Sequence, residues 1–104
     1  MPWQNSNHRY FFNEEAINSN APVDSGVYGL YNIMNWVYIG ESANIREALI
    51  DHSRGRDSCL RNAVPTGFTF ELCPADLRAR RAEALVAELA PVCNRTKLRK
   101  VLGL

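Results

Sequence analysis

A tight β-hairpin over residues 26–40 constrains the fold of this chain more than any other segment. Runs of β-forming residues flank a polar turn at residues 32–35. Strands joined by so short a turn are antiparallel, so a purely parallel sheet is excluded. If Asn32 lies opposite Trp36, then Leu30 faces Tyr38 and Tyr28 faces Gly40.

This register predicts that Tyr28, Tyr38 and Gly40 share one face of the sheet, because side chains alternate along a strand. Two phenols would then converge beside a residue without a side chain. We expect Gly40 to leave room for a nucleic-acid phosphate. The alternative is that both tyrosines are ordinary sheet aromatics, which have high β-propensity.

Three further elements follow the hairpin. Asn44 and Glu47 form a capping-box variant at the start of a helix over residues 44–53. Alternating aromatic and polar residues predict a strand over 66–72, and Pro74 opens a helix to about residue 89. The order ββαβα predicts an α/β fold with a small, three-stranded, mostly antiparallel sheet flanked by helices.

The predicted helices each have one apolar side. On the first helix, the residues at helical spacing are Ile45, Ala48, Leu49 and His52. On the second, they are Ala79, Ala82, Leu85, Val86 and Leu89. His52 either belongs to a site or closes the C-terminus of its helix, where a cation is favoured.

The length predicts one domain over residues 1–104. We divide it into an N-terminal arm (1–25, with a short helix around 14–17), a core (26–94) and a basic C-terminal segment (95–104), which could form a short helix.

No run is apolar enough to span a bilayer, and no secretory signal is evident, so we expect no membrane association and a cytoplasmic location. The three cysteines lack metal or redox spacing and are expected to be buried thiols rather than a zinc site.

Positive charge is clustered although the net charge is only +1. One cluster comprises Arg78, Arg80 and Arg81, and the other comprises Arg95, Lys97, Arg99 and Lys100. Such clusters either bind phosphates or form a solvated helix face and a charged tail.

An ordered set of motifs resembles the GIY-YIG nuclease superfamily over about residues 26–94. The hairpin carries Gly26-Val27-Tyr28 and Tyr38-Ile39-Gly40, and the residues after it include Ser42, Asn44-Ile45 and His52 in register. The C-terminal part matches through Glu83, Leu85-Val86 and a closing segment from Pro91 to Asn94.

The resemblance implies a magnesium-dependent endonuclease that hydrolyses DNA phosphodiester bonds. It assigns magnesium to Glu83, positioning or activation of water to Tyr28, and assistance to Tyr38 and His52. A single hard cation bound by carboxylate would supply Lewis-acid chemistry. Contacts to DNA are expected from Gly40, Ser42, Asn94, Arg78 and Arg81, although Asn94 could equally be a turn or capping residue.

Two positions depart from the family. The family arginine falls at Ala48, and Arg46 lies about 200° around the helix from the position required; Arg54 or Arg56 could reach back from the following loop. An alternative count from Pro91 places the family glutamate at Ala82 instead of Glu83. Three hypotheses follow: an active nuclease with an unusual cation, a naturally degenerate module that binds nucleic acid or protein, and a deliberately inactivated copy.

Overall fold

The computed structural model describes residues 3, 9–55 and 57–94. The basic C-terminal segment and its expected helix lie outside these residues. In chain order the elements are β1 (Tyr10–Phe11), α1 (Glu14–Asn20), β2 (Gly26–Tyr31), β3 (Trp36–Ser42), α2 (Ile45–Ser53), α3 (Ser58–Ala63), β4 (Gly67–Leu72) and α4 (Ala75–Leu89).

The α/β class and the antiparallel sheet are confirmed, but the sheet has four strands in the order β1-β4-β2-β3. The three predicted strands are β2, β3 and β4. The additional strand, β1, pairs Tyr10 with Phe68 and Phe11 with Gly67 at one edge of the sheet. A strand of only two residues has no alternation from which to predict it.

The hairpin confirms the facing pairs Leu30 with Tyr38 and Tyr28 with Gly40. The premise that Asn32 faces Trp36 is wrong, because Tyr31 faces Trp36 and Val37 is an extra residue in a β-bulge. The side chain of Asn32 fixes the turn by accepting hydrogen bonds from the backbone N–H groups of residues 34 and 35, at 2.9 and 2.8 Å. The bulge restores the predicted register beyond the turn.

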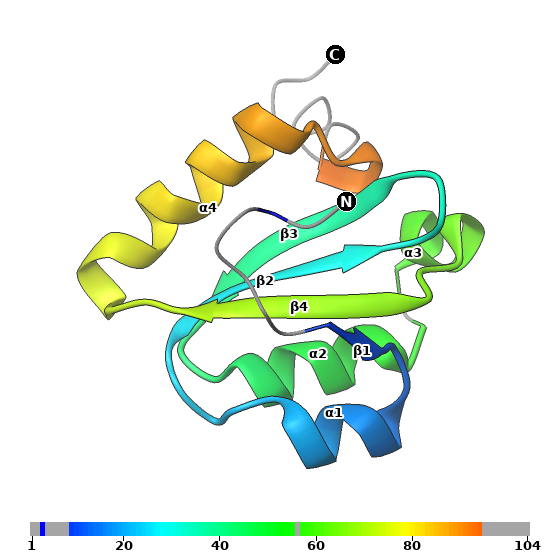
Figure 1. The fold of residues 1–104 in the computed structure, drawn as a ribbon, viewed down its shortest axis with the longest axis horizontal. Coiled ribbons are helices and arrows are strands. Elements are labelled where there is room, and N and C mark those ends of the chain that lie inside the picture. Colours follow the sequence, from blue (N-terminus) through cyan, green and yellow to red (C-terminus); the bar gives the residue numbers. More distant parts are fainter. Residues whose placement is uncertain (1–2, 4–8, 56, 95–104) are drawn as a thin grey trace.

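Helices cover the sheet on both sides (Figure 1). On the first side, which we call the α2 face, Leu30 packs with Ile17 of α1 and Leu49 of α2. On the second, the α4 face, Val27 and Ile39 pack with Leu85 of α4. Alternation along β2 and β3 places Tyr28 and Tyr38 on the α2 face.

The helix ends follow the predicted chemistry. The Asn44 side chain caps α2 by accepting from the N–H of Glu47 at 3.1 Å. Pro74 precedes α4, and Ala90 ends it in a left-handed conformation with φ of 47°. Four residues of the predicted stripe of α4 pack toward the core, whereas Ala79 is exposed.

The described residues of the N-terminal arm contribute to the core. Its predicted helix is present as α1 and extends to Asn20, with Asn13 as its N-cap. Trp3 is 1% exposed and stacks on Trp36 with ring centroids 5.6 Å apart. Its indole N–H has no hydrogen-bond acceptor among the residues described.

The prediction of three buried thiols is wrong, because Cys59 and Cys93 form a disulfide and Cys73 is free and half-buried. The unpredicted helix α3 brings Cys59 to the segment after α4. Disulfides persist mainly in oxidising compartments. The cytoplasmic location therefore stays a prediction, and the Cys59–Cys93 bond argues against it. Within the described part of the chain, no helix has the length and apolar content to cross a membrane.

Candidate functional site

Tyr28, Tyr38 and His52 converge on the α2 face, as the sequence predicted for the two phenols. The Tyr28 Oη and His52 Nε2 atoms lie 2.8 Å apart, in hydrogen-bond contact. The Tyr38 ring centroid lies 6.2 Å from that of Tyr28 and 5.2 Å from that of His52. We call these three residues the aromatic cluster.

Tyr28 is enclosed rather than presented to solvent. Its side chain is 4% exposed. Burial raises the pKa of the Tyr28 phenol far above its ordinary value of 10.0, and the nearby Tyr38, Glu41 and Asp51 raise it further. The phenol is therefore protonated at neutral pH and is unsuited to act as a base.

The space beside Gly40 is filled by the aromatic cluster. A Cβ atom at Gly40 would clash with the Tyr28 hydroxyl, and it would lie 2.6 Å from Tyr28 Cζ and 2.9 Å from Tyr38 Cε2. The expectation that Gly40 leaves room for a phosphate is therefore wrong. Its missing side chain accommodates the Tyr28 ring.

Glu83 does not join the aromatic cluster. It is exposed on α4, which packs on the opposite face of the sheet. Ala82, the alternative position for the family glutamate, packs against the apolar cluster of the α4 face. Among residues 3, 9–55 and 57–94, no three His, Cys, Asp or Glu side chains form a cluster that could hold a metal ion. Because Mg²⁺ can be held by a single carboxylate with waters and substrate phosphates, magnesium at Glu83 stays a prediction, at a position apart from the aromatic cluster.

Two described arginines considered for the cation missing at position 48, Arg46 and Arg54, have other partners. Ala48 packs against the core of the α2 face. The Arg46 Nε donates to the carbonyl of Ala21 at 2.8 Å, and Arg54 pairs with Glu14 at 3.2 Å. Arg56 lies outside the described residues.

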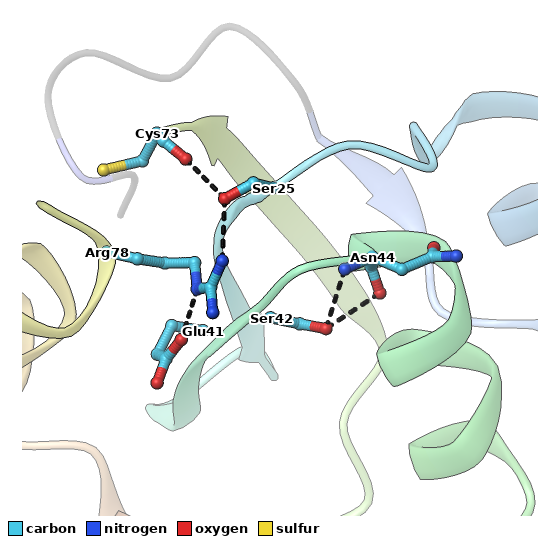
Figure 2. Close-up of polar contacts among 6 residues, drawn as sticks. All are labelled: Ser25, Glu41, Ser42, Asn44, Cys73 and Arg78. Carbon is cyan, nitrogen blue, oxygen red and sulfur yellow. Dashed lines mark hydrogen bonds and ion pairs between the residues drawn. The ribbon is translucent and has the colours of Figure 1, made fainter. Parts of the chain in front are cut away.

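Arg78 and Arg81, from which contacts to nucleic acid were predicted, dock α4 onto the sheet. Figure 2 shows Arg78 donating to Glu41 at 2.5 Å and to the Ser25 hydroxyl at 3.0 Å. The Arg81 guanidinium donates twice to Glu71, at 2.8 and 2.9 Å. This hydrogen bonding is the main reason that the pKa of Arg81 is raised. Both carboxylates flank Val27 in adjacent strands.

Ser42 and Asn94 also have structural partners. The Ser42 hydroxyl donates to the carbonyl of Asn44 and accepts from its N–H, both at 3.0 Å (Figure 2). The Asn94 side chain accepts from the Ile39 N–H at 2.7 Å and donates to the Ile39 carbonyl at 2.8 Å. Since β3 is an edge strand, Asn94 satisfies backbone groups that would otherwise be open.

A cavity of about 430 Å³ lies near β1, at a place that sequence reasoning missed. Its lining includes Arg9, Tyr10, Phe11, Asn20, Tyr31 and Thr66. The sequence did contain one indication of this place, because the alternation of side chains along β2 puts Tyr31 on the face opposite Tyr28. Without β1, however, no partner for Tyr31 across the sheet could be identified.

Comparison of the chain with protein-family models, curated proteins and solved structures finds no match. The resemblance to the GIY-YIG superfamily therefore stays an expectation from the motifs in the sequence.

Proposed function

We propose that this chain is a nucleic-acid-binding module on a GIY-YIG-like scaffold that does not hydrolyse its ligand. The observation that carries the proposal is the separation of the expected catalytic groups. Tyr28 is buried and hydrogen-bonded to His52 on one face of the sheet, and Glu83 is exposed on a helix that covers the other face.

The alanine at position 48 also supports the proposal. A preorganised cation at the transferring phosphoryl group contributes orders of magnitude in rate. Ala48 occupies the position at which the family has its arginine, and the neighbouring Arg46 and Arg54 have other partners.

The proposed binding of nucleic acid is supported by arginines whose charge is not used in polar contacts within the described fold. Arg9 and Arg80 are exposed, and neither makes a hydrogen bond or ion pair with the described residues. The basic C-terminal segment adds two arginines and two lysines within six residues. When such cations bind phosphates, the affinity falls as the salt concentration rises. On single strands, the logarithm of the binding constant falls by about 0.7 per phosphate contact for each tenfold increase in salt concentration.

A binding titration over a range of salt concentrations, beside a plasmid-nicking assay with magnesium, tests the proposal. We expect salt-dependent binding and no cleavage. Cleavage by the wild-type chain would contradict the proposal, and undetectable binding at low salt would contradict it independently.

The second candidate is a magnesium-dependent DNA endonuclease using Tyr28, Tyr38, His52 and Glu83. The convergence of the aromatic cluster favours it. The same nicking assay distinguishes it when run with Glu83→Ala and with Glu88→Ala, a matched exposed carboxylate on α4. A nuclease of this type would lose cleavage only in the Glu83 variant.

A further inference from the structure

Two aromatic residues and a glycine form one row across three strands of the α4 face. Gly67 of β4 pairs with Phe11 of β1 on one side and with Tyr31 of β2 on the other. Residues directly opposite one another in neighbouring strands project from the same face. The row therefore has a ring at each end and no side chain in the middle.

The Tyr31 ring lies across the glycine. A Cβ atom at Gly67 would lie 2.5 Å from Tyr31 Cζ and 2.6 Å from both its Cε1 and its Oη. Trp36 contacts the same ring edge-on, with centroids 5.5 Å apart and planes at 74°. Two neighbours thus fix the orientation of Tyr31, and its remaining side lines the cavity near β1.

Phe11 at the other end of the row is 79% exposed, although it belongs to a strand. An aromatic side chain that stays exposed contributes little hydrophobic free energy to folding. Burial raises the pKa of the Tyr31 phenol, and Arg9 lies close enough for its charge to offset part of that rise. The cavity volume of about 430 Å³ lies within the usual range for small-ligand sites.

We propose that Phe11, Tyr31 and Arg9 form a site for an unpaired nucleotide of a single-stranded nucleic acid. The base stacks on the aromatic rings over Gly67, and the guanidinium of Arg9 binds a phosphate. Every base has a π-face, so such a site tolerates different sequences. A duplex conceals its base faces, so the site favours single strands. This inference rests on the proposed nucleic-acid-binding function.

The test measures binding of a fluorescent oligothymidylate of about ten nucleotides, within the usual site sizes of single-strand binders, and of a duplex of equal length. Base stacking contributes about 1–3 kcal/mol per base, so Phe11→Leu is expected to weaken single-strand binding about 5- to 150-fold. Phe11→Tyr retains a ring and should retain affinity. Leu72→Ala, which truncates an exposed apolar residue at the far end of β4, should change nothing.

Arg9→Gln reports on the phosphate contact. We expect it to reduce the salt slope of single-strand binding by about 0.7. A slope equal to that of the wild type would remove Arg9 from the site.

The outcomes separate the two proposals. If the wild-type chain binds nucleic acid but Phe11→Leu binds the single strand equally well, the stacking site is overturned and the proposed function stands. An equal loss for single strand and duplex would also overturn it, because it would indicate a general surface contact. If the wild-type chain binds neither probe at low salt, both proposals fail.

Discussion

Each of two glycines in the sheet makes room for a phenol ring, and the two rings lie on opposite faces of the sheet. Gly40 makes space for Tyr28 on the α2 face, and Gly67 makes space for Tyr31 on the α4 face. The consequences differ, because Tyr28 is 4% exposed whereas Tyr31 is half-buried. A phenol ring that lies over a glycine is thus buried on the α2 face and partly accessible to solvent on the α4 face.

Gly40→Ala is expected to destabilise the fold by about 1–3 kcal/mol, because the added methyl group must displace the buried Tyr28 ring. Urea denaturation measures the change. As a control, the same substitution in a Tyr28→Leu background should cost less, since the ring is absent. Equal costs in the two backgrounds would show that the clash is not with Tyr28.

Tyr28 also predicts a loss of stability in alkali. Its pKa is raised in the folded chain, so the phenol contributes stability that is complete below the unfolded pKa of about 10 and declines as the pH rises above it. We expect the stability of the wild type to fall more steeply above pH 10 than that of Tyr28→Phe. Chemical denaturation at several pH values from about 8 to 12 measures the difference. Parallel pH profiles would contradict the assignment.

At the scale of elements, α4 is held to the sheet by arginine–carboxylate pairs at its N-terminal half and by apolar packing along its length. The bidentate Arg81–Glu71 pair has side chains 31% and 26% exposed. Because a lysine cannot replace the two parallel hydrogen bonds, Arg81→Lys is expected to cost about 1 kcal/mol in unfolding free energy. Arg80→Lys, on the exposed side of the same helix, should cost nothing.

Replacement of each arginine with glutamine should separate their roles in the binding titration. Arg81→Gln is expected to leave the salt slope unchanged, since that guanidinium is occupied by Glu71, whereas Arg80→Gln should reduce the slope by about 0.7 on a single strand. A reduced slope for Arg81→Gln would show that this arginine contacts nucleic acid.

Most elements could be predicted from sequence, because alternation, capping residues and prolines mark the hairpin, α2, β4 and α4. The short polar helix α3 and the two-residue strand β1 carry no such pattern. Helical spacing correctly indicated which side of α4 is buried, but not which face of the sheet that side covers. Glu83 was expected beside the tyrosines because of the resemblance, and helical spacing carries no signal against that placement. The partners of Arg78, Arg81 and Asn94 also come from distant segments and leave no local signal.

At the scale of the whole molecule, the end of the described chain returns to two distant elements. Cys93 is bonded to Cys59 of α3, and the adjacent Asn94 pairs with Ile39 on the edge strand β3. The disulfide joins residues 34 positions apart. In the chain-entropy account, a crosslink of this span restricts the unfolded chain and stabilises the fold by about 4 kcal/mol.

Reduction of the disulfide with dithiothreitol is therefore expected to lower the unfolding free energy by about 2–4 kcal/mol. Because Asn94 follows Cys93 directly, reduction should also speed hydrogen exchange at the Ile39 amide more than at amides in the centre of β2. Cys73→Ser must respond to the reductant as the wild type does, since Cys73 is outside the bond. Unchanged stability on reduction would mean that packing alone holds this segment, and unchanged exchange at Ile39 would mean that Asn94 keeps its place without the bond.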